Sequence, residues 1–166
     1  METIVDFIAY VLVTGLLATA FMDLWAMTQT RLLGIPSLEY ALVGRWLGHM
    51  PSGKFRHSPI TAATPIGGER LIGWSAHYAI GVVFAGLFIL LGPQGWIDTP
   101  TLGPALLFGA ATVAAPYFIL QPCMGAGIAA RKTPKPNVAK LRSLVAHLSF
   151  GLGLYLAASL ISRLTA

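Results

Sequence analysis

Charged residues are scarce in this sequence, and their scarcity excludes most water-soluble folds. Lys, Arg, Asp and Glu together make up 10% of the chain, whereas a soluble domain carries roughly a quarter. Hydrophobic residues make up 55%, and the mean hydropathy is +0.71. So few charges cannot cover a water-soluble surface, and the composition is that of an integral membrane protein.

Cysteine is also nearly absent, since Cys123 is the only one in 166 residues. A single cysteine cannot form an internal disulfide, and a chain without CxxC or CxxCH lacks the usual zinc-ribbon and haem-attachment patterns. The sequence has no G-x-S-x-G, P-loop or G-x-G-x-x-G motif, so nothing in it indicates nucleophilic or nucleotide chemistry. Whether the protein is an enzyme stays open.

Basic residues outnumber acidic ones, which gives a formal net charge of +5. Nucleic-acid binding would require them to cluster on a soluble surface. Here they concentrate in residues 31–70 and 131–142, between apolar segments, while the segment between 91 and 102 has no Lys or Arg. The positive-inside rule therefore predicts that both basic loops are cytoplasmic and that both chain ends lie outside. Because membrane topology accounts for the basic residues, we expect no binding of nucleic acid.

Four apolar segments are each close to the roughly 20 residues that a helix needs to cross a bilayer. They cover residues 5–27, 71–91, 102–130 and 143–161, and Pro116 and Pro122 interrupt the third. The first contains the A-x-A triplet Ala18–Ala20, but acidic residues precede it, so we expect a retained helix and not a signal peptide. These segments predict an all-α, integral membrane four-helix bundle in a single transmembrane domain, 1–166.

The first cytoplasmic loop, 31–70, contains a helical pattern of its own. Apolar residues recur at helical spacing in 38–47, with Arg45 opposite them and Ser37 as the expected N-cap. We interpret 38–47 as an amphipathic helix on the cytoplasmic membrane surface; the alternative is that it packs on loop residues. His49 and His57 follow, and we expect them to be solvated, with a role as ligands as the alternative.

Two spanning segments resemble each other at their cytoplasmic ends. Residues 70–81 and 140–151 share the pattern basic-Leu-x-small-x-x-Ala-His-x-small-x-Gly, with His77 and His147 in register. Both segments would run in the same direction through the membrane. The pattern predicts two helical hairpins related by an axis along the membrane normal, as in a parallel repeat.

Each spanning segment contributes one chemically capable side chain at a similar depth. His77 and His147 lie about 10 Å along their helices from the nearest basic loop residue, and Asp23 and Cys123 about 12 Å. Each shares a helix face with small residues, which mark close helix contacts in membranes. Gln121 lies beside Pro122 at the same level. We therefore predict a polar site of Asp23, His77, Gln121, Cys123 and His147 in the cytoplasmic half of the bundle.

Three functional hypotheses fit this site, of which the sequence favours the first, with the other two as alternatives. In the first, His77, His147 and Asp23 bind a divalent transition metal, or the two histidines bind a haem iron. In the second, the site relays protons or binds substrate in a small carrier. In the third, the protein is an assembly or regulatory partner, and hydrogen bonds such as Asp23 to a histidine only fix helix register. Cys123 also fits a small apolar role.

The chain resembles a family of small bacterial membrane proteins that is classified as a domain of unknown function. The resemblance spans nearly the whole chain and rests on six segments: 22–26, 34–40, 44–49, 73–78, 121–125 and 141–147. It implies a multi-pass protein of the bacterial inner membrane and assigns no substrate, cofactor or catalytic residue. Beyond the lipid bilayer, we expect a homo-oligomer or a partner membrane protein, because four short helices leave little room for a solute path.

Overall fold

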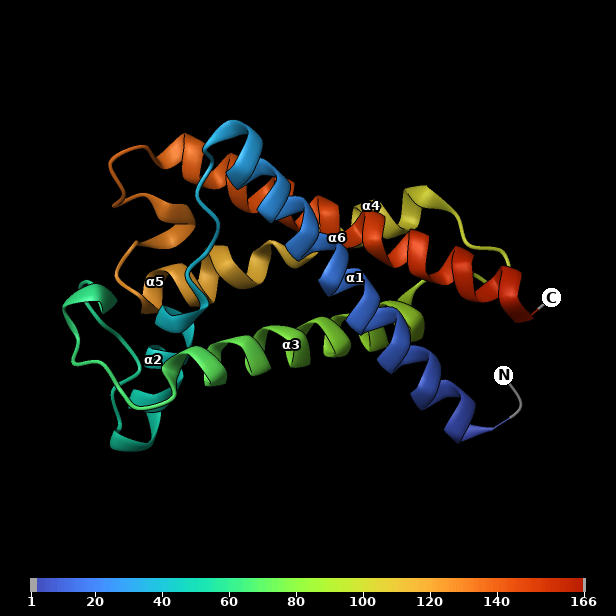
Figure 1. Ribbon diagram of the computed structural model, residues 1–166, viewed down its shortest axis with the longest axis horizontal. Helices are drawn as coiled ribbons and strands as arrows, with labels where there is room; N and C mark the ends of the chain where they lie inside the picture. The colour runs from blue at the N-terminus through green and yellow to red at the C-terminus, as the bar shows by residue number, and fades with distance from the viewer. Residues whose placement is uncertain (1–2, 166) are drawn as a thin grey trace. The chain divides into compact units, whose positions relative to one another are not determined.

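The computed structural model describes residues 3–165, and all regular secondary structure in that range is helical. Four stretches are long and apolar enough to cross a membrane: Ile4–Leu33, Glu69–Leu91, Leu102–Cys123 and Pro136–Thr165. The first, second and fourth are the helices α1, α3 and α6 (Figure 1). The all-α class and the four candidate spans are thus confirmed, whereas the bundle arrangement and the repeat stay predictions.

Helix α1 (Ile4–Leu33) extends beyond the apolar segment that predicted it. Thr3 and Asp6 form a capping box in which the Thr3 hydroxyl accepts from the Asp6 amide and the Asp6 carboxylate accepts from the Thr3 amide. At the other end Gly34 adopts φ +64°, and its amide donates to the carbonyls of Gln29 and Thr30. Because these caps lie outside the apolar run, hydropathy alone placed the helix ends too close together.

The third span is broken, as the two prolines predicted. Helix α4 (Leu102–Thr112) ends before a π-helical segment, η3 (Pro116–Leu120), which is followed by the single turn α5 (Gln121–Cys123). The expected continuation to residue 130 is wrong. Gly125 and Gly127 adopt φ values of +93° and +75°, which an α-helix does not allow, and only the short 3₁₀ turn η4 (Ile128–Ala130) follows.

Helix α6 (Pro136–Thr165) begins seven residues before the predicted 143 and ends four residues beyond 161. Pro136 occupies its first position, where the missing amide costs nothing because no intrahelical partner exists there. Asn137, Lys140 and Arg142 lower the hydropathy of the added first two turns. Hydropathy detects the part of a helix that faces lipid, so it missed these turns.

Helix α2 (Tyr40–His49) packs directly on the first turns of α3 (Glu69–Leu91). A Cβ atom at Gly44 would overlap the backbone of Glu69, and one at Gly73 would overlap the backbone of Tyr40. Arg45 donates from Nε and Nη2 to the two carboxylate oxygens of Glu69, each at 2.8 Å, and this hydrogen bonding raises the pKa of Arg45. The helix itself was predicted, although it is capped at Glu39 and not at Ser37; its location at the membrane surface stays a prediction.

The chain divides into two compact units. Unit 1 comprises residues 1–36, 78–112 and 146–166, and unit 2 comprises 37–77 and 113–145. Helices α3 and α6 therefore supply residues to both. The single transmembrane domain remains a prediction.

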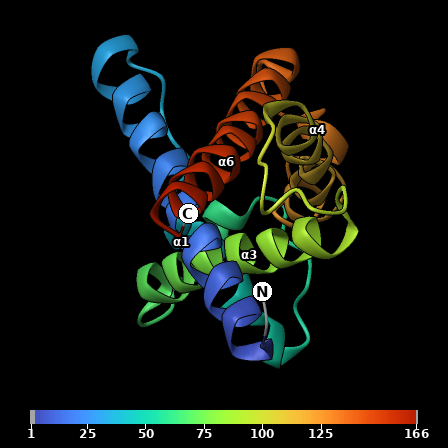
Figure 2. The ribbon, with the colours of Figure 1, turned by 90° about the vertical axis from the view of Figure 1, so that its right-hand side faces the viewer.

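Close helix contacts at small residues build the core of unit 1. A Cβ atom at Gly15 would lie 2.6 Å from the Val82 backbone, and one at Gly153 would lie 2.9 Å from the Ala18 Cα atom. Helix α4 lies along the second half of α6 (Figures 1 and 2), where Gly109 and Gly151 touch. Small residues thus let backbones approach in the way that drives helix association in lipid, where apolar surface alone gives no preference.

Candidate functional site

Asp23 lies in the second half of α1 with 9% of its surface exposed. The Tyr78 hydroxyl of α3 hydrogen-bonds its side chain. One turn earlier, Thr19 lies against Gly81, where a Cβ atom would meet the Thr19 hydroxyl. This close approach of α1 and α3 brings the Asp23 carboxyl within reach of a hydroxyl donor from a different spanning helix.

His147 is held by α4 through one of its ring nitrogens. Its Nδ1 lies 2.8 Å from the Thr112 hydroxyl oxygen, and that hydroxyl donates its only hydrogen to the Gly109 carbonyl at 2.6 Å. With its hydrogen directed at the Gly109 carbonyl, the hydroxyl would accept from Nδ1–H, which is one of the two roles that the histidine tautomers allow. In the neutral ring this leaves the lone pair on Nε2, the tautomer in which Nε2 can take a proton or bind a metal.

Asp23 and His147 lie at a similar level of unit 1. The backbones of α1 and α6 touch at Ala18 and Gly153, and the two helices run in opposite directions (Figure 1). Asp23 follows Ala18 by five residues and His147 precedes Gly153 by six. At 1.5 Å per residue, both lie about 8–9 Å from that contact, on the same side of it.

A layer of four polar residues therefore spans unit 1, with one residue from each candidate span. We call Asp23, Tyr78, Thr112 and His147 the polar layer. Sequence reasoning found Asp23 and His147 but missed Tyr78 and Thr112, because neither carries a charge. The available signals were their positions: Tyr78 follows the singled-out His77, and Thr112 lies four residues before Pro116.

The other predicted site residues belong to unit 2. The His77 ring stacks on Tyr40 of α2 with centroids 4.1 Å apart, and Trp74 packs edge-on to it at 5.9 Å. Because the predicted members divide between the two units, the convergence of Asp23, His77, Cys123 and His147 stays a prediction. The aromatic contacts from α2 were not foreseen, since that helix was expected to lie on the membrane surface.

Gln121 and Cys123 follow the π-helical segment of the third span. The Gln121 amide nitrogen Nε2 donates to the Ser143 hydroxyl at 3.1 Å, while its buried Oε1 has no hydrogen-bond partner among the described residues. Cys123 is half-buried, and its carbonyl accepts from the His57 amide at 2.8 Å. The polar atoms of Gln121, Ser143 and Cys123 thus form a second polar group, in unit 2. It follows directly on a π-helical turn, a feature that is often found at functional sites.

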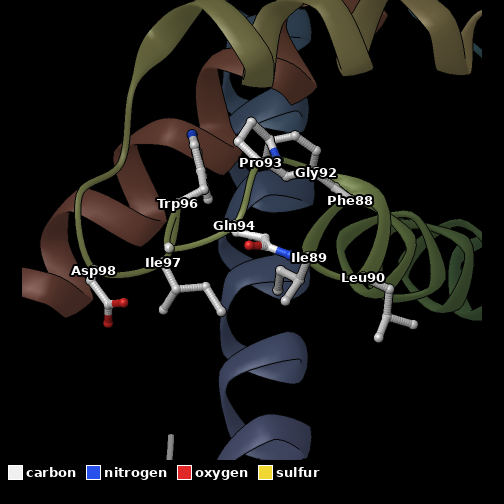
Figure 3. A pocket seen from close by; sticks show the side chains of 10 residues that line it. Phe88, Ile89, Leu90, Gly92, Pro93, Gln94, Trp96, Ile97 and Asp98 are labelled. Atoms are coloured by element: carbon white, nitrogen blue, oxygen red, sulfur yellow. The ribbon is translucent and has the colours of Figure 1, made fainter.

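A pocket of about 280 Å³ lies elsewhere in unit 1, where α3 ends. Figure 3 shows its lining between Phe88 and Asp98, with the Trp96 indole on one side. Phe88 packs edge-on to Trp96 with centroids 4.6 Å apart, and the indole Nε1 donates to the Thr101 carbonyl. None of the predicted site residues lines this pocket, so it is separate from the polar layer.

The described residues form no metal centre with three or more protein ligands. Within residues 3–165, no group of three or more His, Cys, Asp or Glu side chains is placed to hold a metal ion together. The hypothesis of a metal or haem at His77, His147 and Asp23 thus gains no support from these positions and stays a prediction.

Four apolar helices with a polar residue in each define a multi-pass membrane protein. The chain belongs to the family described as "Protein of unknown function (DUF2938)", whose model matches residues 12–161. The expected membership of an uncharacterised family is thus confirmed. No curated protein and no solved structure matches the chain.

Proposed function

We propose that the protein is a small proton-coupled membrane carrier in which Asp23 is the site of protonation. The observation behind this proposal is the burial of the Asp23 carboxyl in a spanning helix, with a hydrogen bond from Tyr78 of another helix. An ionisable side chain at membrane depth is costly, by several kcal/mol, and by default it indicates a functional site with a nearby partner.

Protonation of Asp23 would change its interactions in a defined way. The ionised carboxylate accepts the hydrogen bond from Tyr78, whereas the protonated carboxyl also has a hydrogen to donate. Neutralisation removes the cost of burying the charge, so the two protonation states favour different arrangements of α1 and α3. Such a two-state element is what a carrier needs in order to couple proton uptake to helix movement.

His147 is a suitable second proton acceptor in the same polar layer. Thr112 fixes Nδ1 as the protonated nitrogen and leaves Nε2 basic. We place the layer in the cytoplasmic half of a bacterial inner membrane with both chain ends outside, because the basic residues concentrate in the loops at that end of the helices. A homo-oligomer would supply the space for a solute path that one copy lacks.

Metal or haem binding by His77, His147 and Asp23 is the second candidate, and the His147 tautomer is the observation that favours it. Metal-ligating histidines usually donate their second ring N–H to a nearby acceptor, as His147 does to Thr112. We rank it second because no three ligating side chains group together in the described part of the chain.

The test uses purified full-length protein in sealed proteoliposomes that enclose a pH-sensitive dye. A small-molecule extract of the bacterial cytoplasm, separated into fractions, is added on one side. A carrier gives a fraction-dependent change of internal pH, which Asp23→Asn abolishes and Asp98→Asn, a change in the loop after α3, preserves. If no fraction moves protons across vesicles that contain folded protein, or if Asp23→Asn is as active as the wild type, the proposal is wrong.

A further inference from the structure

The first loop contains a histidine pair that the polar layer does not use. His49 ends α2, and His57 lies eight residues further along the loop. Their ring centroids are 5.2 Å apart, with the planes inclined at 57°. Both residues are partly exposed, so the expectation that they are solvated loop residues stays a prediction.

The ring nitrogens of the pair are unequally satisfied. His49 Nε2 lies 2.9 Å from the Thr64 carbonyl oxygen, which can only accept, so this nitrogen carries the proton and the neutral ring keeps its lone pair on Nδ1. His57 Nε2 is buried and has no hydrogen-bond partner within residues 3–165. A buried polar atom without a partner is destabilising, and an ion bound there is one physical explanation of such an atom.

The chain that follows the third span fixes the position of His57. The His57 amide donates to the Cys123 carbonyl at 2.8 Å, and the Ile60 amide donates to the Met124 carbonyl at 3.0 Å. A Cβ atom at Gly125 would lie 2.7 Å from the His57 carbonyl oxygen, so only glycine permits this approach. The Thr64 carbonyl orients the His49 ring, and the backbone at His57 is held beside it.

We propose that His49 and His57 together bind a divalent transition-metal ion of the zinc type. Two imidazoles on one tetrahedral ion, with metal–nitrogen bonds of about 2.1 Å, place their ring centroids about 5 Å apart, close to the observed 5.2 Å. Neutral imidazole suits zinc, copper and nickel. Water would complete the coordination, consistent with the lack of any three-residue ligand group within residues 3–165. This site lies in unit 2 and is independent of the carrier proposal.

The first test is calorimetric titration of Zn²⁺ into the full-length protein in mild detergent. We expect one ion per chain, with affinity at least about tenfold weaker in His57→Gln, a loss of about 1.4 kcal/mol. His57→Gln should fold normally, because Nε2 has no partner in the loop and the bond from the main-chain amide to Cys123 remains. Size-exclusion chromatography and circular dichroism check the fold.

The matched control is the double variant His77→Gln, His147→Gln, which changes two histidines of the spanning helices. The loop site predicts that this variant binds Zn²⁺ like the wild type, and that Cu²⁺ bound to the wild type shows two nitrogen ligands by electron paramagnetic resonance. The proposal is overturned if the wild type binds no Zn²⁺ or if His57→Gln binds it equally well. It is also overturned if only the double variant loses binding, which would place the metal in the membrane.

Discussion

The hydrogen bond between Thr112 and His147 makes the most direct prediction from the polar layer. Replacing Thr112 by valine keeps the shape of the side chain but removes the hydroxyl that accepts from His147 Nδ1. Interhelical hydrogen bonds in membrane proteins average about 0.6 kcal/mol and reach about 1.7 kcal/mol. The partly buried ring nitrogen of His147 that loses its partner adds to the loss, so we expect Thr112→Val to destabilise the fold by about 1–2 kcal/mol.

The assay is a double-mutant cycle on reversible unfolding in mixed detergent, with Thr112→Val, His147→Gln and the pair. We expect a coupling energy of about 0.6–1.7 kcal/mol between the two positions. Thr28→Val is the matched control, because the Thr28 hydroxyl also bonds a carbonyl one turn earlier but faces outward. Nitrogen NMR on labelled histidine reports the tautomer directly. A wild-type His147 protonated on Nε2, or a coupling energy of zero, would refute the hydrogen-bond assignment.

Three further predictions follow from other contacts. Gly44→Ala should separate α2 from α3, because a Cβ atom would overlap the Glu69 backbone. The near-ultraviolet circular dichroism signal of the aromatic side chains should then weaken. A stronger or unchanged signal would contradict the packing. Gly125→Ala should cost about 1–3 kcal/mol from its positive φ alone and loosen the adjoining loop, so trypsin should cut after Lys54 or Arg56 faster than in the wild type. An absorption spectrum of purified protein should lack a Soret band; a Soret band that disappears in the variant His77→Ala, His147→Ala would replace the carrier proposal with haem binding.

Hydropathy predicted the four spans because lipid-facing residues dominate each of them. Helix ends were predicted less well, since they depend on caps such as Thr3, Gly34 and Pro136, which lie outside the apolar runs. The third span was expected to be broken by Pro116 and Pro122, and it is. Its end at residue 123 was not predicted, because it depends on the positive φ angles of two glycines that lack a strong sequence signature.

The candidate site was half visible from the sequence. Asp23 and His147 were found because ionisable residues are rare within apolar segments. Tyr78 and Thr112 passed unnoticed, because a hydroxyl becomes informative only when its hydrogen-bond partner is known. The contact between His49 and His57 could not be predicted for a similar reason: His57 lies eight residues after His49 in a loop, and sequence spacing in a loop does not determine distance.

The π-helical segment η3 (Pro116–Leu120) has a consequence for how this chain tolerates insertions and deletions. A π turn holds one more residue than an α turn, so removing a single residue there would restore α geometry without breaking the span. The same deletion would leave the preceding and following parts of the helix facing nearly the same way, because four α-helical residues turn the chain by about 400°, close to the turn of the five π-helical residues they replace. Homologous chains that differ in length by one residue at this point would thus keep four spans and keep Gln121 and Cys123 on the same face of the helix.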